Sequence, residues 1–153
     1  MLLAILQALQ AYRMDEVPVG AVLVDWAQNY VVHACHNKVN CDKSVVHHAE
    51  MLVLEYGSRY FNTKYLDMCD LYVTIEPCNM CSTAISYYKI RNLYFGCYET
   101  KFGAIESNTM YFNQKSCFHK PDIYYGLFAE ESKNIIQSFF LKRRKKKKCF
   151  RVI

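Results

Sequence analysis

Apolar residues follow two spacings along the chain, one typical of helices and one typical of strands. Leu2, Leu3, Leu6 and Leu9 recur as one stripe of an amphipathic helix. Short Val-, Ile- and Tyr-rich runs bounded by polar residues predict strands. The expected elements are a helix at about 2–13, strands at 19–24 and 30–35, a helix at about 47–59 with Met51, Leu52 and Leu54 on its buried side, a strand at 71–75, a helix from Pro77 to about 89, strands at 93–95 and 123–125, and a helix at about 129–144.

Strands and helices alternate through the middle of the chain, which predicts an α/β fold with helices packed on the faces of a sheet. The first two strands are joined only by the polar segment 25–29, so we expect them to form an antiparallel hairpin. The strand–helix–strand units that follow should be parallel and right-handed. The sheet should therefore be mixed, with five strands.

Length and charge suggest one domain followed by a basic tail. A chain of 153 residues suits a single core. Its formal charge is +5, but seven of the nineteen basic residues lie between Lys142 and Lys148, so the rest of the chain is close to neutral. We expect one domain at 1–144 and a tail at 145–153 that meets a polyanion, of which RNA is the commonest. The alternative is a solvated helix end.

The eight cysteines would suggest disulfides in a small secreted protein. However, the first residues have no preceding positive charge, are interrupted by Gln7 and Gln10, and lack a cleavage pattern. The sequence contains no run of eighteen apolar residues, which a membrane span would need. We therefore expect a cytoplasmic protein without a membrane partner, with reduced thiols available to bind metal.

Three metal-ligating side chains lie at the expected starts of two helices. Cys78 and Cys81 are three positions apart, which on a helix places both thiols on one face, about 5–6 Å apart. A helix start also favours thiolate over thiol. His48, at the start of another helix after a polar loop, is the best candidate for a third ligand. Three protein ligands leave the fourth position of a tetrahedral zinc open for water, as in catalytic sites.

Glu50 is the candidate proton carrier beside this metal. Zinc lowers the pKa of bound water from near 16 to about 7, and a neighbouring carboxylate can move protons to a ring nitrogen and to departing ammonia. The pattern therefore predicts a hydrolytic deaminase with one zinc ion per chain. The alternative is a redox Cys-x-x-Cys and an unrelated surface His-x-Glu. A thioredoxin-like pair would favour Trp beside the first Cys, where this chain has Glu76 and Pro77.

His48-Ala-Glu50 followed by Pro77-Cys78-Asn-Met-Cys81 matches the H-x-E…P-C-x-x-C signature of zinc-dependent nucleobase deaminases. Further segments make the chain resemble the tRNA-specific adenosine deaminases, which form inosine at the wobble position. The resemblance implies a three-layer α/β/α deaminase fold with its active site near the interface of a homodimer. The resembling segments lie at 16–22, 36–37, 48–50, 71–78, 95–96, 101–104 and 129–144, and the resemblance extends over nearly the whole chain, from about residue 2 to residue 144.

The resemblance also implies substrate contacts. Asn37 would bind the extruded base and its ribose, the Ala49 backbone would contact the purine edge, and Val19 would pack on the ring. The anticodon nucleotides would meet four further residues, Glu99, Lys101, Phe140 and Arg143. The chain departs from the family pattern at His47, Glu99, Glu106 and the segment 108–121.

The leading hypothesis is hydrolysis of adenosine to inosine in a tRNA anticodon stem-loop. A first alternative keeps the chemistry but acts on a free base or nucleoside, such as cytosine, cytidine or guanine. A second alternative is a catalytically silent, zinc-stabilised RNA-binding subunit, for which the carboxylate of Glu50 would have no use. The basic, aromatic closing helix favours RNA, because loop bases are held by stacking and phosphate contacts.

Overall fold

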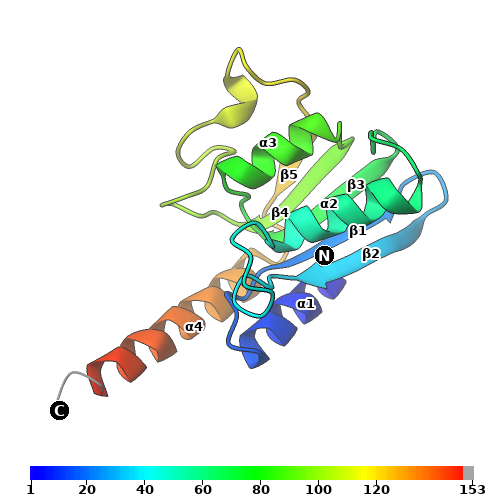
Figure 1. Ribbon diagram of the computed structural model, residues 1–153. Coiled ribbons are helices and arrows are strands. Elements are labelled where there is room, and N and C mark those ends of the chain that lie inside the picture. The colour runs from blue at the N-terminus through cyan, green and yellow to red at the C-terminus, as the bar shows by residue number, and fades with distance from the viewer. Residues whose placement is uncertain (150–153) are drawn as a thin grey trace.

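The apolar runs of the sequence form strands that join into one sheet, as the computed structural model of residues 1–149 shows (Figure 1). The strands lie side by side in the order β2-β1-β3-β4-β5. β1 pairs antiparallel with β2 and with β3, whereas β3, β4 and β5 are parallel. The elements are α1 (Leu2–Arg13), β1 (Gly20–Asp25), β2 (Tyr30–His36), α2 (Ala49–Tyr60), β3 (Cys69–Ile75), α3 (Asn79–Tyr87), β4 (Asn92–Cys97), a 3-10 turn η1 (Tyr111–Asn113), β5 (Asp122–Tyr125) and α4 (Ala129–Cys149).

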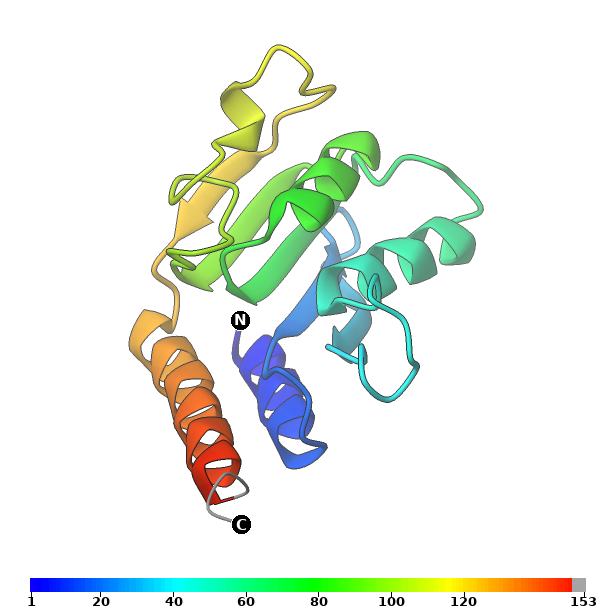
Figure 2. The same ribbon diagram turned by 60° about the vertical axis from the view of Figure 1, so that its left-hand side comes forward.

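Helices cover both faces of this sheet. α2 and α3 pack on one face, while α1 and α4 lie side by side on the other (Figures 1 and 2). The main core lies between the sheet and the α2–α3 layer, where Leu71 and Phe95 of the sheet meet Val53 of α2 and Ile85 of α3. The predicted three-layer α/β/α architecture with a mixed five-stranded sheet is therefore confirmed.

The leucine stripe of α1 is not the buried face that its spacing suggests. Leu2 is 61% exposed and Leu6 is 54% exposed. The buried face instead consists of Ala4, Ile5, Ala8 and Ala11. The reason is a very close approach to β1, since a Cβ atom on Gly20 would lie only 2.0 Å from the Ala4 carbonyl oxygen. Only small side chains fit between two backbones at that distance.

Two helices at the candidate site begin later than expected. α2 begins at Ala49 rather than at about 47, with His48 as an extended N-cap. α3 begins at Asn79 rather than at Pro77, with Cys78 as its extended N-cap. Within α2, Leu54 is buried in the core and Leu52 is half-buried against it, as expected, whereas Met51 is half-buried without being part of the core and Val53 is fully buried in it.

The last helix continues through the basic run. α4 ends at Cys149, five residues beyond the expected end at 144, so residues 145–149 of the proposed tail are helical. The remaining tail residues, 150–153, lie outside the described residues. Within residues 1–149, none of the helices has the length and apolar character needed to cross a membrane. Every cysteine from Cys35 to Cys117 is a free thiol.

The approach of α1 to β1 gives a test of the fold. Gly20→Ala should lower the free energy of unfolding by about 1–3 kcal/mol or more, because the added methyl group would overlap the rigid α1 backbone. Gly57→Ala is the control, since its Cβ would mainly meet the flexible end of Leu23 and alanine favours a helix. Urea unfolding of both variants measures the difference. Equal stability of the two would contradict the close packing of α1 on β1.

Candidate active site

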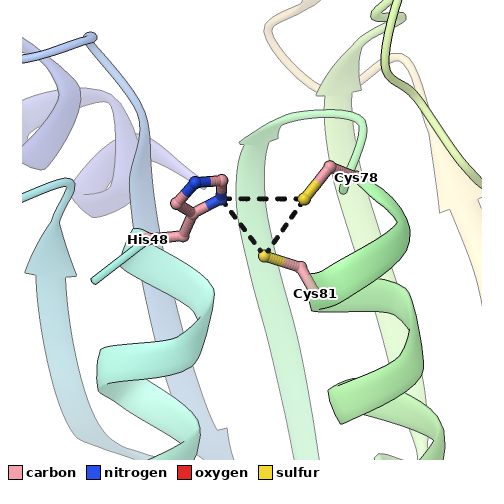
Figure 3. Close-up of side chains that lie close together, drawn as sticks. All are labelled: His48, Cys78 and Cys81. Carbon is pink, nitrogen blue, oxygen red and sulfur yellow. Dashed lines mark hydrogen bonds between the residues drawn. The ribbon is translucent and has the colours of Figure 1, made fainter. Parts of the chain in front are cut away.

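Three side chains from the starts of two helices meet at one end of the sheet (Figure 3). His48 is the N-cap of α2, Cys78 is the N-cap of α3, and Cys81 lies in the first turn of α3. The Nδ1 atom of His48 lies 3.7 Å from the Cys78 sulfur and 3.5 Å from the Cys81 sulfur. The two sulfur atoms are 3.7 Å apart. The structure therefore brings together the three residues that the sequence proposes as metal ligands.

These distances can be compared with those that a zinc ion requires. Zinc binds thiolate sulfur at about 2.3 Å and imidazole nitrogen at about 2.0–2.1 Å with tetrahedral angles. That geometry places two sulfur ligands about 3.8 Å apart and a sulfur and a nitrogen ligand about 3.6 Å apart. The triangle of His48, Cys78 and Cys81 matches both values. Its donor set, one imidazole and two thiols, also suits zinc rather than magnesium or calcium.

The local electrostatics already favour a thiolate in this triangle. The hydrogen bond with Cys81, followed by that with His48, lowers the pKa of Cys78 to about 4. The same sulfur–sulfur contact, together with burial, raises the pKa of Cys81 well above its ordinary value. The hydrogen bond with Cys78 raises the pKa of His48. A negatively charged Cys78 sulfur therefore stands where a cation would bind, and the proton that it helps His48 to retain is one that a bound metal would displace.

Glu50 is a buried carboxylic acid beside this triangle. It lies in the first turn of α2, two residues after His48, and only 3% of it is exposed. Burial raises its pKa above the usual range for glutamate. Its Oε2 atom has no hydrogen-bond partner within the described chain. A buried and unpaired carboxyl oxygen is costly, which indicates that this atom faces a ligand or a reacting molecule.

A cavity of about 340 Å³ opens in front of His48, Glu50 and Cys78. Four other residues proposed from the sequence line it, namely Val19, Asn37, Glu99 and Phe140. The cavity wall also contains residues that the sequence analysis did not single out as site residues: Val17, Val39, Asn40, Ile75, Glu76, Phe102 and Ile136. Most of these are apolar side chains, whose spacing cannot distinguish a cavity wall from a core.

Three further proposed residues do not line the cavity. Ala49 is fully buried at the start of α2. Lys101 is exposed, and its ammonium lies 4.9 Å from the ring centroid of the cavity residue Phe102. Arg143 donates a hydrogen bond of 2.8 Å to the backbone carbonyl of Asp15, so α4 is joined to the segment after α1.

A buried carboxylate supports one wall of the cavity. Glu16 is 1% exposed and accepts hydrogen bonds from the side chains of Asn37, at 3.4 Å, and Asn40, at 3.0 Å. It also accepts one from the backbone of Cys41, at 2.7 Å. These contacts hold the segment after β2 in place. The signal in the sequence was an acidic pair, Asp15 and Glu16, directly before the apolar run at 17–24.

A second buried carboxylate, Glu76, supports the opposite wall. It is 2% exposed and accepts hydrogen bonds from the segment 99–107, which carries Glu99 and Phe102. Burial acts to raise the pKa of Glu76, but the hydrogen bonds from Ser107 and the backbone outweigh it and hold that pKa below its ordinary value. Neither carboxylate could be singled out from the sequence, because only the fold brings their partners to them: two asparagine side chains and one backbone group for Glu16, and mainly loop backbone groups for Glu76.

Comparisons with known proteins agree with this site. The cytidine and deoxycytidylate deaminase zinc-binding region matches residues 1–97. A tRNA-specific adenosine deaminase of Rickettsia bellii is 41% identical over 141 residues, which cover 92% of this chain and 97% of the relative. The tRNA-specific adenosine deaminase of Agrobacterium fabrum is 42% identical over 142 residues, which cover 93% of this chain and 92% of the relative.

Solved structures of deaminases resemble this chain in fold, and one of them also resembles it closely in sequence. A structure from a study of A-to-I editing by tRNA:A34 deaminases at the wobble position of transfer RNA has a TM-score of 0.85 and 42% identity. The match covers 88% of this chain and 96% of that one. A guanine deaminase from Nitrosomonas europaea has a TM-score of 0.71 over 89% of this chain and 80% of its own, at 16% identity. This second likeness concerns the fold alone.

The triangle predicts how metal content depends on Cys81. Cys81→Ala should reduce bound zinc from about one ion per chain to a small fraction, and should lower thermal stability because metal binding contributes to folding. Cys69→Ala is a matched control, since Cys69 is equally buried but lies at the start of β3. Elemental analysis after zinc reconstitution measures the difference. Equal zinc content in the two variants would exclude Cys81 as a ligand.

Proposed function

The chain belongs to the family of the tRNA-specific adenosine deaminases, and from this premise we propose that it hydrolyses adenosine to inosine at the wobble position of tRNA. The observation that carries the proposal is the triangle of His48, Cys78 and Cys81 with the unpaired carboxyl oxygen of Glu50 beside it. The cavity in front of them has about 340 Å³, within the range of about 300–1,000 Å³ that small-molecule sites occupy.

We assign the metal-binding role to His48, Cys78 and Cys81. Zinc bound there would supply Lewis-acid activation of a water molecule near neutral pH. Glu50 then accepts a proton from the attacking water and passes it to the adenine ring nitrogen. It next takes the second proton from the oxygen added to the ring carbon and delivers it to the amino group, which leaves as ammonia while that oxygen becomes the carbonyl of inosine. The products balance the reactants, since adenosine and water give inosine and ammonia.

The environment of Glu50 suits the transfer of protons. A proton carrier is most effective when its pKa lies near the working pH, so that it can both accept and return a proton. Burial moves the pKa of Glu50 in that direction. The absence of hydrogen-bond donors to Oε2 in the described chain leaves that atom available to the water and the substrate. A structural zinc site would not need a buried, unpaired carboxyl group.

We propose that the cavity walls hold the extruded adenosine. Val19 and Phe140 offer apolar surface to the base, and Asn37 offers its amide. Because the Asn37 amide nitrogen is bound to Glu16, its carbonyl oxygen is left to accept a hydrogen bond from the substrate. The Ala49 backbone would contact the purine edge, and Glu99 the neighbouring nucleotides.

The RNA around the target base would lie along α4. Lys101 and Arg143 are placed outside the cavity, where they can meet phosphates of an anticodon stem-loop. A loop nucleotide is already partly unstacked, so its extrusion into the cavity costs less than extrusion from a duplex. We propose residues 1–144 as the deaminase domain and 145–153 as the RNA-binding tail. A homodimer and a cytoplasmic location stay predictions.

The proposal predicts inosine in a defined RNA. Incubation with an isolated anticodon stem-loop that carries adenosine at the wobble position should give inosine, measured by nucleoside analysis. Free adenosine and free cytidine should be poor substrates, because they lack the phosphates and loop bases. Glu50→Gln should keep its zinc and its fold but lower turnover by about 10²–10⁴, the usual contribution of a positioned acid–base group.

Three other outcomes would change the proposal. Efficient deamination of free cytosine or guanine with none on the stem-loop would favour a small-molecule deaminase. Tight RNA binding with no turnover on any substrate would favour a silent subunit. Loss of zinc in Glu50→Gln would make Glu50 a ligand rather than a proton carrier.

The basic end of α4 predicts a dependence on salt. Deletion of residues from 145 onward should weaken stem-loop binding and flatten its salt dependence by about 0.7–0.9 in log–log slope for each phosphate that a basic side chain no longer neutralises. Turnover at saturating RNA should hardly change, because the deletion leaves the cavity intact. Binding titrations at several salt concentrations measure the slope. An identical slope for the full chain and the deletion would show that the basic run is a solvated helix end.

A further inference from the structure

Glu76 has no part in the chemistry proposed above, although it is one of the most completely bonded side chains in the molecule. It follows Ile75, the last residue of β3, and precedes Pro77 and the metal-ligand candidate Cys78. Only 2% of it is exposed. A buried carboxylate at such a place requires several hydrogen bonds to offset its desolvation.

The donors all come from one loop, which we define as the 98–107 loop and which follows β4. Glu76 Oε1 accepts from three consecutive backbone N–H groups, those of Ile105 at 3.0 Å, Glu106 at 2.8 Å and Ser107 at 3.0 Å. Glu76 Oε2 accepts from the backbone N–H of Glu99 at 3.0 Å and from the hydroxyl of Ser107. Within residues 1–149, these four N–H groups have no backbone acceptor, so Glu76 is their partner.

Further backbone contacts join the 98–107 loop to the two residues that follow Glu76, toward the metal site. The N–H of Ala104 donates to the Pro77 carbonyl at 2.9 Å, and Gly103 pairs with Cys78 as an isolated antiparallel bridge. A Cβ atom on Gly103 would lie 2.3 Å from Glu76 Oε2. Glycine at that position is therefore what allows the loop to sit directly on the carboxylate.

The loop also forms part of the cavity wall. Glu99 and Phe102 line the cavity, and they lie between the two points at which Glu76 holds the loop, the N–H of Glu99 and the N–H groups of 105–107. Ala104 and Ile105 of this loop are buried in the core, but Phe102 is 62% exposed and its neighbour Lys101 is exposed too, so core packing does little to fix residues 101 and 102. Hydrogen bonds have to do so instead.

We infer that Glu76 is a positioning residue, whose carboxylate fixes the 98–107 loop against the metal-binding segment and so sets how tightly the RNA is held. This inference rests on the proposed function. Glu76 touches neither the metal triangle nor Glu50 by any hydrogen bond in the described chain. Glu76 itself forms part of the cavity wall, but both of its carboxylate oxygens are bound to the loop, so it acts through Glu99 and Phe102, which line the same cavity.

Glu76→Gln tests this with little change of volume. An amide has one acceptor oxygen in place of two, so at least one N–H group of the loop must face an NH₂ group. We expect kcat/KM on the stem-loop to fall about 10- to 100-fold, as for the loss of one or two charge-assisted hydrogen bonds. This fall should come from a rise in KM, with kcat close to that of the parent chain, because the loop contributes to binding rather than to proton transfer.

Glu106→Gln is the matched control. Glu106 belongs to the same loop and its substitution also removes a charge, but its carboxylate is exposed and, within residues 1–149, accepts only from the Tyr98 hydroxyl, at 2.8 Å. It should keep the parental KM. Ser107→Ala removes one of the donors to Glu76, so it should raise KM in the same direction as Glu76→Gln but by less. Zinc content should be unchanged in all three variants.

Hydrogen exchange tests the loop without any substrate. In Glu76→Gln the amides of Glu99 and of 105–107 should exchange at least about tenfold faster than in the parent chain, while those of α3 stay protected. Failure of the parent chain to deaminate the stem-loop would defeat the proposed function but leave this exchange result intact. Unchanged exchange, loss of zinc, or a fall in kcat at constant KM would each overturn the positioning role.

Discussion

The site depends on two helix starts that must come within a few ångströms of each other. His48 is thirty residues away from Cys78 in the sequence, and each caps its own helix in an extended conformation. β3 leads directly into the start of α3. The start of α2 lies on the same face of the sheet, because α2 packs beside α3. The spacing of the three ligand atoms is therefore a product of how the strands pair.

Three buried glutamates around the cavity differ in one respect, the number of hydrogen bonds that they accept. Glu76 accepts five and Glu16 accepts three, so both are saturated and serve to hold loops. Glu50 has an oxygen with no partner in the described chain. A carboxylate that accepts several hydrogen bonds is held in place by them, whereas one with an unpaired oxygen is left open to a water molecule or a substrate. The same type of side chain thus supports structure in two places, and in the third it has the free oxygen that the proposed proton transfer requires.

The sequence was most informative where the number of residues between two positions determines the local structure. The grouping of His48, Cys78 and Cys81 could be predicted, because each lies at a helix start and the two thiols are three positions apart. The mixed sheet could be predicted too, from the short hairpin and the later alternation of strands and helices. The roles assigned to individual substrate-binding residues stay predictions, since the structure only places them.

Other features could not be predicted, for physical reasons. The leucines of α1 have the right spacing for a buried stripe, but the gap at Gly20 admits only the alanine face. The spacing of apolar residues along a helix says nothing about how closely its backbone approaches a neighbouring strand. The partners of Glu76 are backbone groups of an irregular loop, and every residue type except proline has the same N–H group to offer. The extension of α4 through a run of lysines likewise contradicts what charge repulsion alone would suggest.

That extension gives the molecule a spacer of fixed length. Ile136 and Phe140 of α4 form part of the cavity wall, Phe139 is buried against Tyr12 of α1, and Lys145 lies farther along the same helix. With a rise of 1.5 Å per residue, Lys145 stands about 13 Å beyond Ile136 along the axis. One inserted residue between them would turn every later charge by about 100°. The helix therefore fixes the direction as well as the distance at which positive charge is presented, which a flexible tail of equal charge could not do.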